Sequence, residues 1–181
     1  MELSEIQKNY PEISAAANDL LGLLGPGFTN MPKGHVETDI AAAASLAGLM
    51  ILKNKGFDLG EFMPGSVLLT ELDTEMDEIW NFMMAAAGAM GLNPSGGWDQ
   101  EIPESHKPRY TIPEMTHKIE NEFLALCNRH HLEKGFFPQV AVLAALKLVY
   151  AADKMHMLDQ NIGKALTGYH VVAGAKTVPY P

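Results

Sequence analysis

The chain has 181 residues, of which 47% are hydrophobic and 19% are charged, and its formal net charge is −9. This length and composition are typical of one folded domain, residues 1–181, and exclude an intrinsically disordered chain. Its 13 Lys and Arg residues are scattered, whereas binding of nucleic acid or an anionic membrane needs them clustered. We therefore expect neither nucleic acid nor a membrane as a partner.

A single cysteine, Cys127, excludes a disulfide framework and a zinc site made of several cysteines. The first residues are acidic and lack the apolar core of a secretory signal. The longest apolar run, residues 40–52, is too short to span a bilayer as a helix. We therefore expect a cytoplasmic protein.

The first two predicted helices are residues 11–24 and 37–55. Pro11 suits the first turn of a helix, and Gly25-Pro26-Gly27 stops it. The second helix is apolar on all sides, which predicts a central position, and Gly56 suits a left-handed cap. One face of the second helix is mostly small and should let another backbone approach closely: Ile40, Ala43, Ala44, Ala47 and Ile51.

Four more helices complete an all-α bundle of about six helices. Thr111 and Glu114 fit a capping box at the start of the fourth helix, and Asp159 fits the N-cap of the sixth. The carboxylates at the start of the third helix are stabilised by the helix dipole. These helices are predicted over residues 67–90, 111–131, 138–156 and 160–175.

Two long loops, residues 25–36 and 92–110, make the bundle irregular. Loops of this length are commonly functional when they belong to a folded domain. The second loop carries the apolar residues Trp98 and Ile102 in a polar segment. Burial of a tryptophan stabilises a fold by about 2–3 kcal/mol. We therefore predict that this loop is ordered and lies over the helices.

Asp153 and His156 lie one helical turn apart, where they continue the apolar stripe of Val142, Leu146 and Val149. One interpretation is a hydrogen-bonded polar pair that closes the core, with His156 favourably placed at a helix C-terminus. The other is a metal site or an acid–base site.

Glu75 is the acidic residue nearest the apolar stripe of the third helix, and we expect it to join this pair. The fourth and fifth helices are joined by a short connection, residues 132–137, and are therefore expected to be antiparallel. If the third helix starts at the same end, then Glu75 meets Asp153 and His156. Two carboxylates and one imidazole suit a divalent transition metal. Glu75, Asp153 and His156 are therefore the predicted ligand-binding residues. The sequence does not indicate which cofactor, if any, is bound.

Other motifs have structural interpretations. Glu114 and His117 match the Glu-x-x-His pair of di-iron bundles, but helical spacing turns both toward solvent. Cys127 flanks an apolar stripe and is predicted to be inert packing rather than half of a catalytic pair with His130. Lys147 is predicted to lie on a solvated helix edge with Gln139, Tyr150 and Lys154.

Residues 33–35 (Lys-Gly-His) follow a glycine-rich stretch that could cradle a phosphate. The acidic side chains of Glu37 and Asp39 in the next helical turn would repel an anion. We therefore interpret this segment as an ordinary loop.

Two functional hypotheses remain. The first is a non-catalytic, self-associating helical protein that binds a partner or a small apolar ligand. It rests on the absence of catalytic motifs and on surfaces of small residues that the core of one chain does not need. One such surface, made of Ala85, Gly88 and Ala89, predicts a homodimer. The alternative is a metal-dependent or acid–base enzyme that uses the cluster of Asp, His and Glu.

Overall fold

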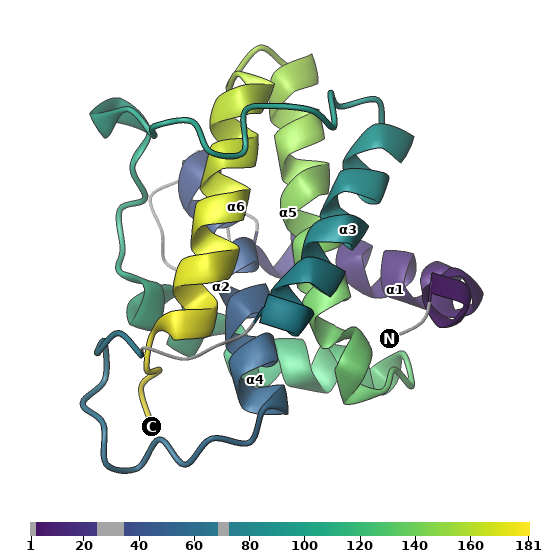
Figure 1. The fold of residues 1–181 in the computed structure, drawn as a ribbon. Helices are drawn as coiled ribbons and strands as arrows, with labels where there is room; N and C mark the ends of the chain where they lie inside the picture. The colour runs from purple at the N-terminus through teal and green to yellow at the C-terminus, as the bar shows by residue number, and fades with distance from the viewer. Residues whose placement is uncertain (1–2, 25–34, 69–72) are drawn as a thin grey trace.

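The computed structural model describes residues 3–24, 35–68 and 73–181. These residues form six α-helices and two short 3₁₀ helices, which confirms an irregular all-α bundle (Figure 1). In chain order the elements are α1 Leu3–Leu24, α2 Val36–Asn54, α3 Asp73–Ala89, η1 Glu104–His106, α4 Ile112–Arg129, η2 Lys134–Phe136, α5 Phe137–Lys154 and α6 Gln160–Lys176.

Helix α2 is the central helix, as its all-round apolar sequence predicts. Every residue from Ile40 to Leu52 is buried, and Thr38 is buried as well. Helices α5 and α6 pack against it, and a short turn connects the two, so that they run side by side in opposite directions (Figure 1). Gly56, just after α2, has a left-handed φ of +67°, which confirms the predicted cap.

The backbones of α2 and α6 touch where they cross. A Cβ atom added at Gly48 of α2 would overlap the carbonyl oxygen of Val171, and one added at Gly174 of α6 would lie 2.9 Å from Ser45 Cα. Neither position has room for a side chain. The small residues of α2 therefore do admit a close neighbour, and α6 is that neighbour.

Helices α4 and α5 are not antiparallel, so that prediction is wrong. Helix α4 lies across the lower part of the molecule, and α5 rises away from it (Figure 1). The connection does not form a tight hairpin because its last residues are buried. Phe136 belongs to the core, and the ring of Phe137 packs edge-on against Phe123 of α4 at a centroid distance of 6.0 Å.

Two helix starts differ from the prediction. Helix α1 begins at Leu3, so Pro11 lies inside the helix rather than in its first turn. Ile6 is buried, and this core contact explains why the helix also includes the residues that precede Pro11. Residues 25–27, the predicted stop, lie outside the described residues.

The described part of α3 starts at Asp73, and the predicted helical start at Val67 is wrong, because Val67 and Leu68 pair with the C-terminal tail. Val67 forms an isolated antiparallel bridge with Thr177. The N–H of Leu68 donates to the carbonyl of Lys176 at 2.7 Å. Leu68 and Val178 are buried together with Leu52 in a small second cluster.

One stretch of the described residues, Lys134–Lys154, has the length and composition of a membrane-crossing helix. Its mean hydropathy is 1.5, and 72% of the apolar window is buried inside the fold. The core helix of a folded domain meets the same criterion.

Candidate ligand-binding groove

An open groove with a volume of about 910 Å³ lies between α6 and the segment of residues 98–108. This segment follows α3, crosses over α6 and descends beside it toward α4 (Figure 1). Aromatic and charged side chains together line the groove: Trp80, Trp98, Tyr169, His170, Asp99, Glu101, Glu104 and Lys107.

The aromatic wall is built by α3, α6 and the segment between them. Trp80 and Trp98 pack edge to face, with ring centroids 5.4 Å apart. Trp98 is 7% exposed, and its indole N–H donates to the carbonyl of Pro94 at 2.9 Å. Tyr169 is 59% exposed and offers a large aromatic surface at the groove. The burial of Trp98 confirms that the 92–110 loop is ordered over the helices.

The rim of the groove is acidic. The lining contains three carboxylates, those of Asp99, Glu101 and Glu104, and one ammonium, that of Lys107. Its formal charge is therefore −2. Glu104 and Lys107 form an ion pair at 2.5 Å, and this contact raises the pKa of Lys107. The groove therefore presents two carboxylates in excess to a ligand.

His170 supplies a neutral imidazole to the same groove. The side chain is 5% exposed, and burial lowers its pKa to about 4. Its Nδ1 lies 2.8 Å from the carbonyl oxygen of Leu166, one turn earlier in α6. The ring of Tyr169 packs edge-on against it, with centroids 4.9 Å apart. At neutral pH the imidazole is therefore uncharged and held in place.

Lys164 of α6 holds one end of the 98–108 segment. Its side chain is fully buried, and its ammonium donates to the carbonyls of Asn93 at 2.8 Å and Gly96 at 2.7 Å. The same ammonium lies 5.8 Å from the ring centroid of Trp98. Burial lowers the pKa of Lys164. One buried cation thus fixes the loop that leads into the groove wall.

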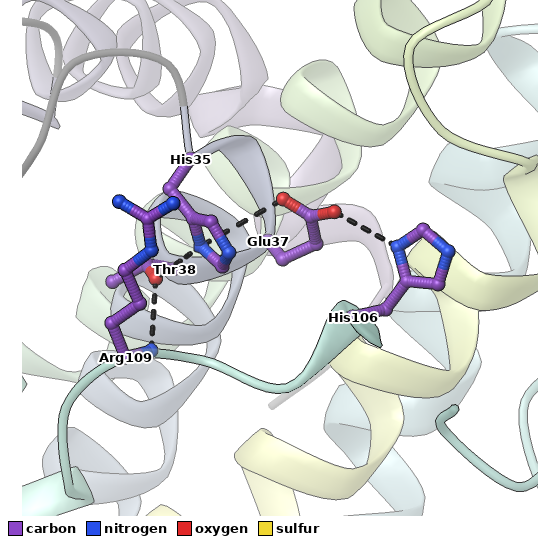
Figure 2. A network of polar contacts seen from close by, with 5 residues as sticks. All are labelled: His35, Glu37, Thr38, His106 and Arg109. Atoms are coloured by element: carbon purple, nitrogen blue, oxygen red, sulfur yellow. Dashed lines mark hydrogen bonds and ion pairs between the residues drawn. The ribbon is translucent and has the colours of Figure 1, made fainter. Parts of the chain in front are cut away.

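A polar network at the start of α2 holds the other end of the segment (Figure 2). Glu37 lies between two imidazoles, with His106 Nδ1 at 2.9 Å and His35 Nδ1 at 3.7 Å. The backbone N–H of Arg109 donates to Thr38 Oγ1 at 3.1 Å, and His35 Nδ1 lies 2.6 Å from the same hydroxyl. These contacts tie residues 106–109 to α2.

Burial tunes the acid–base groups of this network. It lowers the pKa of His35, and the positive charge of Arg109 contributes in the same direction. It raises the pKa of the nearby Asp39 to about 6, with a further contribution from the charge of Glu37. Throughout the described part of the chain, no three His, Cys, Asp or Glu side chains are arranged to hold a metal ion.

The three predicted ligand-binding residues are not brought together. Glu75 forms an ion pair with Lys55 at 2.5 Å, beside Pro138 at the start of α5. Asp153 and His156 lie at the opposite end of α5, and His156 is exposed. The apolar stripe does not continue to His156 because α5 ends at Lys154 and His156 adopts a left-handed turn with φ of +56°.

Other sequence motifs have the structural roles expected of them. Glu114 and Thr111 form the capping box, and His117 is exposed and packs edge-on against Tyr180. Burial raises the pKa of the Cys127 thiol to about 12, which makes it inert packing. Residues 33 and 34 lie outside the described residues.

The predicted polar edge of α5 needs a correction. Gln139 is buried, because it lies at the start of the helix among core residues. Lys147 is half-buried rather than free in solvent, and its ammonium contacts Ser14 Oγ at 3.0 Å and Asn18 Oδ1 on α1 at 2.6 Å. Burial lowers its pKa.

Trp98 is predictable from the sequence as an anchor of the loop, whereas the opposite wall of the groove, on α6, was not predicted. The available signal was the triplet Gly168-Tyr169-His170, which places a residue without a side chain beside two rings. A Cβ atom at Gly168 would lie 3.2 Å from the carbonyl oxygen of Trp98, so the glycine lets the loop approach α6. No family model, curated protein or solved structure matches this chain.

Proposed function

We propose that this is a non-catalytic binding protein whose groove takes a small, flat organic cation. One observation carries the proposal: an aromatic groove of about 910 Å³ has two more carboxylates than ammonium groups in its lining. The sequence predicts a partner or a small apolar ligand, and the acidic rim indicates that such a ligand also carries a positive charge. The alternative of an enzyme built on Glu75, Asp153 and His156 gains no support, because these residues lie apart.

The chemistry of the lining favours a cation with a ring. A cation over an aromatic face gains about 0.5–1 kcal/mol at an exposed site and about 2 kcal/mol when it is desolvated. Tyr169 and Trp80 supply such rings, and a flat ligand can also stack against them. The net charge of −9 raises the local concentration of cations around the whole molecule.

The groove is also held in shape before a ligand arrives. Lys164 anchors the segment at residues 93–96, and the contacts of Glu37 and Thr38 anchor it at residues 106–109. A wall that is fixed at both ends loses little conformational freedom on binding, which favours affinity.

A matched pair of probes tests the proposal. Isothermal titration calorimetry would compare 2-naphthylmethylammonium with the neutral 2-naphthylmethanol, which has the same ring. We expect the cation to bind at least roughly fivefold more tightly, a difference of about 1 kcal/mol, and less so at high salt. Equal affinity for the two probes, or no binding of the cation, would overturn the proposal.

Charge variants locate the effect. The double variant Asp99→Asn with Glu101→Gln removes the excess carboxylates and should remove most of the preference for the cation. Glu122→Gln removes the same kind of charge from the exposed side of α4 and is the control, since it lies outside the groove. A preference that survives in the double variant would show that the rim does not select the ligand.

Self-association and a cytoplasmic location remain part of the proposal. Ala85, Gly88 and Ala89 of α3 are exposed and form a small-residue surface. A shallow apolar depression with a volume of about 320 Å³ adjoins it, lined also by Tyr10 and Phe82. This surface supports a homodimer whose interface is separate from the ligand groove.

A further inference from the structure

The tautomer of His170 is fixed by its position in α6. Nδ1 lies 2.8 Å from the carbonyl oxygen of Leu166. A carbonyl oxygen accepts and cannot donate, so the proton of the neutral ring must be on Nδ1. The other nitrogen, Nε2, therefore carries a lone pair and acts as a hydrogen-bond acceptor.

This acceptor has no protein donor among the described side chains, and the ring lines the groove. Among the described residues, the fully buried side-chain N or O atom without a hydrogen-bond partner is Ser45 Oγ. Nε2 of His170 does not belong to this class, so it is not sealed inside the core. The residue as a whole is 5% exposed. Water in the open groove can donate to this acceptor, and a ligand donor at the same position takes the place of that water.

The lining also restricts which donor fits. The carboxylates of Asp99, Glu101 and Glu104 favour a positively charged ligand. The neutral imidazole favours a ligand group that can donate a hydrogen bond to Nε2. A protonated amine or an amidinium meets both requirements. A quaternary ammonium has the charge but no hydrogen to donate, and would leave Nε2 without a partner.

We infer that the ligand is a flat-ring compound with an N–H on its cationic nitrogen, such as an arylmethylammonium or arylamidinium, and that His170 Nε2 accepts this N–H. The inference rests on the proposed function and names the ligand class of the same groove. Tyr169 and Trp80 receive the ring, the acidic rim attracts the charge, and His170 selects the hydrogen-bond donor.

The test compares 2-naphthylmethylammonium with its N,N,N-trimethyl derivative by calorimetry at pH 7. The two probes share ring and charge, and only the first carries N–H groups. We expect the wild-type protein to bind the first at least tenfold more tightly, as a hydrogen bond to a charged group predicts. His170→Phe keeps a ring and removes the acceptor, and it should bind both cations equally.

Two further variants keep this test decisive. His170→Gln offers an amide oxygen near the position of Nε2 and should keep part of the preference, and it replaces the phenylalanine variant if that one does not fold. His117→Phe changes an exposed imidazole outside the groove and should keep the full preference.

The outcomes separate the two proposals. If the wild-type protein binds both cations equally and more tightly than the neutral probe, the role of His170 is wrong and the cation groove stands. If the preference persists in the phenylalanine variant, the larger trimethyl group is excluded by size and the role of His170 is again wrong. If neither cation binds, the proposed function itself fails.

Discussion

The ammonium of Lys164 lies 5.8 Å from the centre of the Trp98 ring, and both side chains are buried. The lysine belongs to α6 and the tryptophan to the segment that crosses it. Two backbone carbonyls, those of Asn93 and Gly96, complete the contacts of the ammonium. Within the described part of the chain, this one cation thus joins the two walls of the groove without a carboxylate in hydrogen-bond contact with it.

Replacement of this cation should loosen the groove wall. Lys164→Met keeps an apolar side chain of similar length but leaves both carbonyls without their charged donor. We expect the free energy of unfolding to fall by about 2–3 kcal/mol. Urea denaturation followed by tryptophan fluorescence measures it. Lys154→Met, at an exposed lysine near the ring of Tyr150, is the control and should change stability little. Equal effects of the two variants would contradict an anchoring role for Lys164.

The crossing of α2 and α6 predicts opposite effects of one substitution at two helical glycines. Gly174→Ala forces a methyl group to within 2.9 Å of Ser45 Cα, and we expect a loss of roughly 3 kcal/mol or more. Gly22→Ala in α1 meets no atom within 4 Å and should stabilise by about 0.5–1 kcal/mol, because alanine favours the helix. Thermal unfolding of both variants would show it, and a tolerated Gly174→Ala would mean that the helices do not touch there.

The buried His170 and the half-buried Asp39 should give the stability opposite dependences on pH. The pKa of His170 is about 4 in the fold, below the usual 6.5, so between these values the unfolded chain binds more protons. Stability from this group is therefore lost as the pH falls from 6.5 to 4. The pKa of Asp39 is about 6 in the fold, above the usual 3.8, so the folded chain binds more protons there. Stability from this group is gained as the pH falls from 6 toward 4.

The two slopes oppose each other between about pH 4 and pH 6 in the wild-type protein. Asp39→Asn removes one of them, so the stability of this variant should fall by up to about 1.4 kcal/mol per pH unit as the solution is acidified. His170→Phe should give the opposite slope. Denaturation series at several pH values test both variants. If each variant keeps the wild-type profile, the two groups do not titrate as their burial implies.

Self-association is a separate prediction of the small-residue surface on α3. Sedimentation equilibrium should give about twice the monomer mass of 19.7 kDa. Ala85→Glu places a charge on this surface and should shift the mass toward the monomer. Ala125→Glu changes an exposed alanine on α4 and should not. A monomer mass for the wild-type protein would remove the prediction.

The helices could be predicted because their signals are local. The unbroken apolar run of α2, the cap at Asp159 and the anchor at Trp98 each involve neighbours in the sequence, and the structure confirms them. The position of Asp153 and His156 could not be predicted in the same way. A helical wheel gives the face of a residue but not where the helix ends, and α5 ends before His156.

The groove could not be predicted because distant segments form it. Residues 98–108 meet α6 only through the fold, and the partners of Lys164 are backbone carbonyls, which leave no mark in the sequence. The angle between α4 and α5 likewise depends on the burial of Phe136 and Phe137. The sequence pattern gave no indication of the angle at which the short connection, residues 132–137, would join the two helices.

The most direct test of the groove as the ligand site is a ¹⁵N–¹H nuclear magnetic resonance titration of the wild-type protein with 2-naphthylmethylammonium. We predict saturable shifts concentrated at residues 98–108, at residues 165–172 of α6 and at the indole N–H of Trp80. Shifts that centre instead on residues 85–89 of α3, or the absence of saturable shifts, would contradict the assignment of this groove as the binding site.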